Sequence, residues 1–403
     1  MKKIFTIIFA AIFLFGGFSA EAAKKPSKKQ LAKIEQSIKE YMDESKVTGM
    51  SIVLVKGQET IYQNALGFKD IKSGTPLEID NIFRIASISK SFSAVSILQL
   101  VEAGKISLDD DVNDIMGMNI RNPRYPDTPL TIRMLLSHTS SMKDGPGGAA
   151  RYRDLTYIDE SRTDIETIKK QAYHEYAPGQ GFSYCNRALN LMGCVIEKVS
   201  GERFDNYVLN HILRPMGLSE KEAGYNIDTL DKSLAASLYN YDKKSKTLKK
   251  STTAYSRKEY GEKAVEAGTY EIGKNGWAWS PTGGMKISAP NLAKWMMTLR
   301  DGGIAPNGTR IVSEESVKLM MTPGLDGYGL CTRTKTNYLP GITLKGHTGS
   351  AQGLKSFMFF DKDSDWGFVF ICSSTNLKKD ENKNLLIAMK TLNLLYDSFI
   401  KEK

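Results

Sequence analysis

Cysteine and histidine are scarce in this chain, with four of each among 403 residues. The four cysteines are too few for the disulfide framework that stabilises small secreted domains. Cys185 and Cys194 fall on one expected helix, about 13 Å apart at 1.5 Å per residue, so we expect no disulfide between them. A disulfide between Cys331 and Cys372 on neighbouring strands remains open.

The histidines also argue against metal chemistry. His138, His174 and His211 are scattered, with no Glu or His at the spacing of zinc ligands, so a zinc hydrolase is not expected. A Gly-x-Ser-x-Gly nucleophile elbow is missing from the chain after its first residues, which excludes an α/β-hydrolase. We expect no metal ion and no organic cofactor.

Long apolar runs are absent except at the N-terminus. There, Lys2 and Lys3 precede an apolar run over Ile4–Phe15 and small residues at Ala20 and Ala22, the pattern of a secretory signal peptide. The run is shorter than the roughly 20 residues that span a bilayer. No cysteine near the junction could accept a lipid anchor. The sequence predicts cleavage after Ala22 and a periplasmic or secreted protein with no integral membrane segment.

The charge balance is positive, with a formal net charge of +10 that falls to about +9 without the predicted signal peptide. Much of this charge lies in lysine runs that are typical of solvated surface, at 24–29, 243–250 and 378–379. No nucleic-acid-binding module accompanies it, so we expect no nucleic acid partner. Attraction to an anionic cell envelope is a more natural use.

The two ends of the chain are predicted to form strands, and the middle is predicted to be helical. Helices are expected over Ser27–Ser45, Ser87–Ala103, Ala188–Val199 and Asn382–Phe399, and strands over Met50–Val55, Glu59–Phe68, Ile342–Leu344, Lys355–Phe360 and Trp366–Ile371. After the signal peptide at 1–22, residues 23–403 therefore form one catalytic domain. Its α/β lobe comprises about 27–86 and 285–403, and a helical lobe of about 87–284 is inserted between them, with a cleft where the lobes meet.

Ser87 and Lys90 form the first chemical motif, at the start of the most apolar helix. A serine at a helix N-terminus lies near free backbone N–H groups, and a lysine three residues later projects from the same face. A lysine held in a desolvated cleft can lose its proton and activate the hydroxyl. Ser-x-x-Lys alone is weak evidence, because it also occurs at Ser140–Lys143 and Ser398–Lys401.

Two further motifs follow Ser87 in order. Tyr184-Cys185-Asn186 and His347-Thr348-Gly349, with flanking stretches at 130–140 and 280–288, make the chain resemble the serine β-lactamase and D-alanyl-D-alanine carboxypeptidase superfamily, nearest to its class C and esterase-like branch. The resemblance covers nearly the whole chain after the signal peptide. It implies an α/β (α+β) fold, in which helices flank an antiparallel sheet and an all-helical lobe is inserted.

The resemblance also implies roles for individual residues. Ser87 would attack a carbonyl to form an acyl-enzyme, while Lys90 and Tyr184 share the proton transfers. A tyrosine near two cationic groups can have a lowered pKa and serve as a base.

The substrate-binding residues follow from the same resemblance. Asn186 would orient the substrate amide and hydrogen-bond Lys90. The backbone N–H groups of Ser87 and Ser350, next to Gly349, would form the oxyanion hole. His347 and Thr348 would contact the far end of the substrate.

Substrate choice is the least determined feature. His347 stands where dedicated class C β-lactamases carry lysine, so we expect D-alanyl or other D-residue peptides of the cell wall, or small esters, ahead of β-lactams. An imidazole near its ordinary pKa would bind a carboxylate better as pH falls toward 6. A class C-like β-lactamase and a penicillin-binding or sensing protein that acylates without turnover remain alternatives.

Overall fold

The computed structural model describes residues 26–118, 120–144, 171–242, 244–351, 353–374 and 377–401. The predicted signal peptide lies outside these ranges. Within the described ranges, no helix combines the length and apolar character needed to cross a bilayer.

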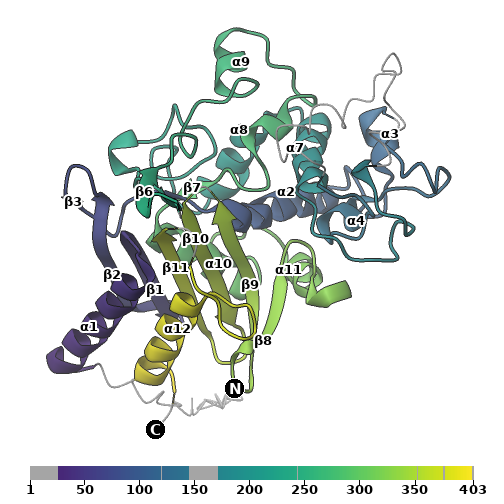
Figure 1. Ribbon diagram of the computed structural model, residues 1–403. Coiled ribbons are helices and arrows are strands. Elements are labelled where there is room, and N and C mark those ends of the chain that lie inside the picture. The colour runs from purple at the N-terminus through teal and green to yellow at the C-terminus, as the bar shows by residue number, and fades with distance from the viewer. Residues whose placement is uncertain are drawn as a thin grey trace, which may run out of the picture.

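A seven-stranded antiparallel sheet, built from both ends of the chain, forms the centre of the fold (Figure 1). The strand order is β3-β2-β1-β11-β10-β9-β8. These strands are β1 (Gly49–Lys56), β2 (Glu59–Asp70), β3 (Thr75–Pro76), β8 (Arg333–Leu339), β9 (Ile342–Ala351), β10 (Leu354–Asp361) and β11 (Trp366–Ser373). β1 and β11 join the two ends, with Gly49 opposite Ser373. The predicted strands are therefore present, and β9 is much longer than expected.

Helices cover both faces of this sheet. Every residue of β11 is buried, as expected for a central strand covered on both sides. On one face, Ile52 and Leu54 of β1 pack with α1 (Lys28–Ser45) and α12 (Leu386–Phe399), which lie next to each other. On the other face, Val53 and Val55 pack with α2 (Lys90–Glu102) and α10 (Ala289–Arg300). This α/β arrangement agrees with the predicted fold class.

The remaining helices and strands are short, apart from α7. They are α3 (Val112–Met116), α4 (Ile132–Leu136), α7 (Asn186–Ser200), α8 (Phe204–Val208), α9 (Glu262–Glu266), α11 (Glu314–Met321), β4 (Phe83–Arg84), β5 (Tyr239–Asp242), β6 (Thr247–Lys250) and β7 (Lys286–Ile287). α1 begins one residue later than predicted because Ser27 caps it, with Gln30 completing a capping box. α12 begins at Leu386 because Asp380 and Asn384 form a hydrogen-bonded turn before it.

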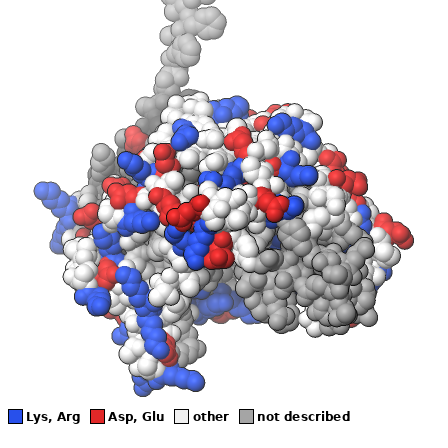
Figure 2. Space-filling view, turned by 90° about the horizontal axis from the view of Figure 1, so that it is seen from above, with Lys and Arg blue, Asp and Glu red and all other residues white. Residues whose placement is uncertain are grey.

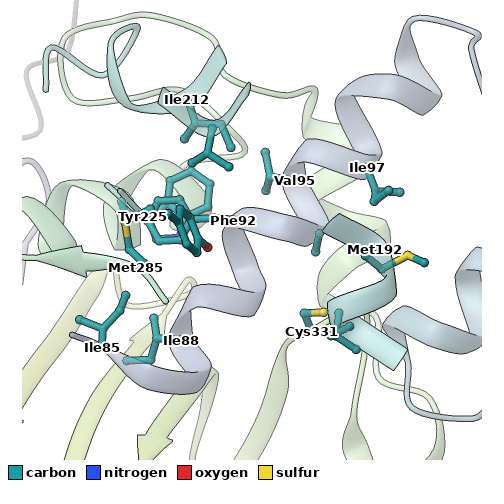
Figure 3. Close-up of a cluster of buried hydrophobic side chains, with 14 of the residues drawn as sticks. Ile85, Ile88, Phe92, Val95, Ile97, Met192, Ile212, Tyr225, Met285 and Cys331 are labelled. Atoms are coloured by element: carbon teal, nitrogen blue, oxygen red, sulfur yellow. The ribbon is translucent and has the colours of Figure 1, made fainter. Parts of the chain in front are cut away.

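α2 is the central helix of the molecule, and nearly all its residues are buried. Its first turns lie in an apolar cluster that includes Ile85, Ile88, Phe92 and Val95 (Figure 3). The Phe92 ring stacks on Trp295, with the two ring centroids 4.3 Å apart. The helix was predicted to begin at Ser87. Instead, a 3₁₀ turn over Ala86–Ser89 precedes it, because the Ser89 hydroxyl donates to the Ala86 carbonyl and tightens the turn.

The Cys331–Cys372 disulfide left open by the sequence is not formed, since all four cysteines are free and buried. Cys372 lies on β11, which is separated from β8 by the two strands β10 and β9, and packs in the core beneath α1 and α12. Cys331 lies in the other core, where its Sγ is 3.5 Å from the Leu136 carbonyl oxygen. The sheet itself therefore separates the two thiols.

The lysine run at 243–250, expected to be solvated surface, overlaps the β5–β6 hairpin. Two of its lysines are paired: Lys249 contacts Asp242, and Lys250 contacts Asp70 of β2. On the face shown in Figure 2, basic and acidic side chains are likewise interspersed. This face therefore offers no continuous basic surface of the kind that binds nucleic acid.

Candidate active site

Ser87 lies in the turn between β4 and α2, against strand β9. Ala86 has a φ of 50°, which places the turn in a left-handed conformation. At Gly349 a Cβ atom would lie 2.3 Å from the Ile85 carbonyl oxygen, so only glycine permits this approach of the strand. The Ser356 hydroxyl donates to the same carbonyl at 2.8 Å. The third motif therefore brings β9 directly against the nucleophile turn.

The amine of Lys90 is fully buried and has three hydrogen-bond partners. Its Nζ lies 3.1 Å from Ser87 Oγ, 2.8 Å from Asn186 Oδ1 and 2.9 Å from the Thr282 carbonyl oxygen. Burial lowers the pKa of Lys90 to about 7, because a charged amine loses its hydration there. Near neutral pH a large fraction of this lysine is therefore the free base.

These partners determine where the free amine directs its lone pair. The Asn186 Oδ1 and Thr282 carbonyl oxygens can only accept, so they take the two N–H groups of the neutral amine. Ser87 is the one partner of the three that can donate a proton. The geometry thus aims the Lys90 lone pair at the Ser87 hydroxyl, which is the arrangement required of a general base.

Tyr184 lies beside this pair, with Lys90 Nζ 4.9 Å from the centre of its ring. The expectation of a lowered tyrosine pKa is wrong: burial raises the pKa of Tyr184 above its ordinary value, and the nearby Ser87 hydroxyl opposes this only in part. Its buried hydroxyl makes no hydrogen bond of normal geometry to another described residue. The phenol is therefore protonated and can act as a proton donor.

His347 lies on β9 with both of its ring nitrogens hydrogen-bonded. Its side chain is 3% exposed, its Nε2 lies 3.0 Å from the Tyr328 hydroxyl, and its Nδ1 lies 2.6 Å from the Thr348 carbonyl oxygen. Since the carbonyl only accepts, Nδ1 carries the proton and Nε2 accepts from Tyr328. Burial lowers the pKa of His347 to about 3. The predicted titration of His347 near pH 6 is therefore wrong, while its contact with substrate stays a prediction.

Alternation along β9 separates the other residues of the third motif. Gly349 shares a face with His347, whereas Thr348 and Ser350 alternate with them and are partly or fully exposed. The side chains of Thr348 and Ser350 therefore point to the opposite face of the strand. Any contribution of Ser350 to an oxyanion hole would come from its backbone N–H.

Arg333 on β8 is a cation of the site that no sequence motif revealed. Its guanidinium lies 5.0 Å from the centre of the Tyr328 ring, 5.8 Å from that of Tyr184 and 5.9 Å from that of Phe182. The side chain is 22% exposed, and its nearest carboxylate oxygen is 3.7 Å away on Asp326. Arg333 thus supplies a partly exposed positive charge next to the tyrosine of the catalytic group.

The chain is similar in sequence to several characterised bacterial proteins. Penicillin-binding protein 4* of Bacillus subtilis is 27% identical over 46% of this chain and 40% of its own. D-alanyl-D-alanine-carboxypeptidase/endopeptidase AmpH of Escherichia coli is 27% identical over 44% and 45%. Esterase EstB of Burkholderia gladioli is 28% identical over 47% and 50%. Each match spans about half or less of the relative's length.

Solved structures and a family model extend the match across the chain. The octameric penicillin-binding protein homologue from Pyrococcus abyssi has a TM-score of 0.70 and 27% identity, covering 91% of this chain and 77% of that one. D-amino acid amidase from Ochrobactrum anthropi has a TM-score of 0.67 over 91% and 98%, and its 19% identity shows the fold alone. The family model described as Beta-lactamase matches residues 34–391. The chain therefore belongs to the β-lactamase family of serine hydrolases and penicillin-binding proteins.

Proposed function

We propose that the protein is an exported serine hydrolase that cleaves amide or ester bonds through an acyl-enzyme at Ser87. One observation carries the proposal: a buried lysine with a pKa of about 7 lies 3.1 Å from a serine hydroxyl and has acceptors at its other two positions. The apolar N-terminal run supports export.

The reaction follows from the protonation states. Lys90 Nζ takes the Ser87 proton while Oγ forms a bond to the substrate carbonyl carbon. The backbone N–H groups of Ser87 and Ser350 stabilise the oxyanion. The protonated Tyr184 hydroxyl then gives its proton to the leaving amine or alcohol as that bond breaks. Lys90 returns its proton to Tyr184, and water hydrolyses the acyl-enzyme by the same groups in reverse. No step uses a metal ion or cofactor.

For substrates, we propose D-residue peptides of the cell wall with a free carboxylate, followed by small esters. The activities of AmpH, EstB and the D-amino acid amidase support this range. Arg333 supports the preference for a carboxylate, because a guanidinium pairs well with that group. In the sequence analysis, the replacement of a lysine by His347 counted against binding of a substrate carboxylate. Arg333 provides the positive charge that His347 does not supply, so that argument no longer holds.

A substrate panel with time-resolved intact mass tests the proposal. Protein comprising residues 26–403 would be incubated separately with a D-alanyl-D-alanine peptide, a small neutral ester and a cephalosporin. A transient mass increase with release of product would support an enzyme that turns over. A permanent adduct with every substrate would instead support a penicillin-binding or sensing protein, and cephalosporin hydrolysis faster than the other two would support a β-lactamase.

We predict that Arg333→Ala raises KM for a carboxylate-bearing peptide by about 10- to 100-fold, the value of one charge-assisted hydrogen bond. A neutral ester with the same acyl group should change little, because it places no carboxylate near Arg333. Arg333→Lys is the matched control, since it keeps the charge but loses the planar pairing. Equal losses on both substrates would show that Arg333 acts on Tyr184 and not on the substrate.

A further inference from the structure

Asp144 contacts the catalytic group from outside the three motifs. Its Oδ2 accepts from the Asn186 backbone N–H at 3.1 Å and from Asn186 Nδ2 at 2.8 Å, while its Oδ1 accepts from the Arg187 N–H at 3.0 Å. The preceding N–H, of Cys185, donates to His138 Nδ1 at 3.2 Å. Three consecutive N–H groups at the start of α7 are therefore bound by side chains of the 138–144 segment.

The bond to Nδ2 has a consequence beyond capping the helix. A carboxylate only accepts, so it holds the NH₂ group of Asn186 and leaves Oδ1 facing Lys90, 2.8 Å from Nζ. With the amide turned over, Nδ2 would face Lys90 and donate to its lone pair. Asn186 would then compete with the Ser87 hydroxyl for the base.

We propose that Asp144 is a positioning residue that fixes the amide orientation of Asn186 and thereby directs the Lys90 lone pair to Ser87. The inference rests on the proposed function and deepens it, because it names a group that controls the base without touching substrate. Asp144→Asn removes the charge and replaces one acceptor oxygen by a donor, so it cannot hold the three N–H groups that the carboxylate binds.

The charge of Asp144 also raises the pKa of Lys90, against the larger effect of burial. Loss of this charge and loss of the Asn186 acceptor both disfavour the ammonium form. Asp144→Asn should therefore lower the pKa of Lys90. The other titratable groups that bear on Lys90 come from several elements and are unchanged in this variant: Arg84, His138, Tyr184, Cys185, Cys331 and His347.

The test compares wild type and Asp144→Asn in two ways. Carbon-13 NMR of labelled lysine, assigned against Lys90→Met, gives the pKa of Lys90 without any need for turnover. The rate of Ser87 labelling by a fluorophosphonate gives the reactivity of the hydroxyl. We expect a lower Lys90 pKa together with labelling slowed by about tenfold or more at every pH, because the base is misdirected.

Ser313→Ala is the matched control, since Ser313 caps α11, away from the catalytic residues, by accepting from Ser316 N–H at 3.1 Å. It should lower the melting temperature by a few degrees, as the loss of a cap does, with no change in the Lys90 pKa or labelling. A second check uses the double variant Asn186→Ala with Asp144→Asn. If Asp144 acts through Asn186, this double variant should be labelled only a little more slowly than Asn186→Ala alone.

The proposal would be overturned if Asp144→Asn left the pKa of Lys90 unchanged and lowered the melting temperature only as much as Ser313→Ala does. Asp144 would then be a helix cap and nothing more. Failure of the proposed function looks different. There, the fluorophosphonate would not label Ser87 of the wild type, while the NMR titration would still report whether Asp144 acts on Lys90.

Discussion

Ser87→Ala should abolish covalent labelling by a penicillin or fluorophosphonate and lower turnover of any substrate by about 10⁴-fold or more. The reason is that no other described hydroxyl is paired with the Lys90 amine, which lies 3.1 Å from Ser87 Oγ. Because Ser87 is small and only partly buried, loss of its oxygen should leave the fold intact. Peptide mapping of the labelled protein and stopped-time hydrolysis assays measure both effects.

The two other Ser-x-x-Lys sequences provide the controls for this prediction. The Ser140 hydroxyl is buried, and the Ser398 hydroxyl donates back to the Leu394 carbonyl oxygen of its own helix at 2.6 Å. Neither hydroxyl is paired with the Lys90 amine. The Ser398→Ala variant should therefore be labelled, and should turn over substrate, like the wild type. Label found on Ser140 or Ser398, or label that survives in Ser87→Ala, would contradict the assignment of the nucleophile.

Replacing Lys90 by methionine should lower kcat/KM by on the order of 10²–10⁴-fold, the usual contribution of a general base. Methionine has nearly the length of lysine and suits a fully buried position, so the packing around α2 should persist. In the wild type, activity requires the free amine. Since the pKa of Lys90 is about 7, kcat/KM should rise with pH through that value and fall away in acid.

The pH profile of the variant separates this role from a structural one. Lys90→Met should lose the acid limb near pH 7 along with most of its rate, while thermal melts confirm a folded protein. A variant that kept near-normal activity, or a wild-type profile flat between pH 5.5 and 8.5, would mean that another group activates Ser87. His347 is a poor candidate for that group, because burial holds its pKa at about 3 and both its nitrogens are hydrogen-bonded.

Three motifs in the sequence predicted the candidate catalytic group, and two of them lie at the start of a helix. Ser87 and Lys90 belong to one turn of chain, and Tyr184 and Asn186 flank Cys185, the N-cap of α7, so the relative positions within each pair are set by local geometry. Short apolar runs bounded by turn residues likewise predicted β1, β2, β9, β10 and β11. The fold class and the family could therefore be predicted from the sequence.

Other properties depend on contacts between distant segments and could not be predicted. His347 is neutral because Tyr328 and the surrounding core enclose it, whereas its sequence neighbours suggest an ordinary histidine. Tyr184 keeps its proton because burial outweighs the nearby cations. Arg333 and Asp144 reach the site from an edge strand and a loop, and neither belongs to a motif with a recognisable spacing.

The pairing of β1 with β11 bears on the order in which the protein can fold during synthesis. Gly49 and Ser373 are partners in the register, so β1 has no neighbour on that side until nearly the whole chain has left the ribosome. The paired residues of β1 and β11 are thus separated by most of the sequence. Folds with contacts between such distant residues form slowly. Completion of the sheet is consequently a late event in the folding of this chain.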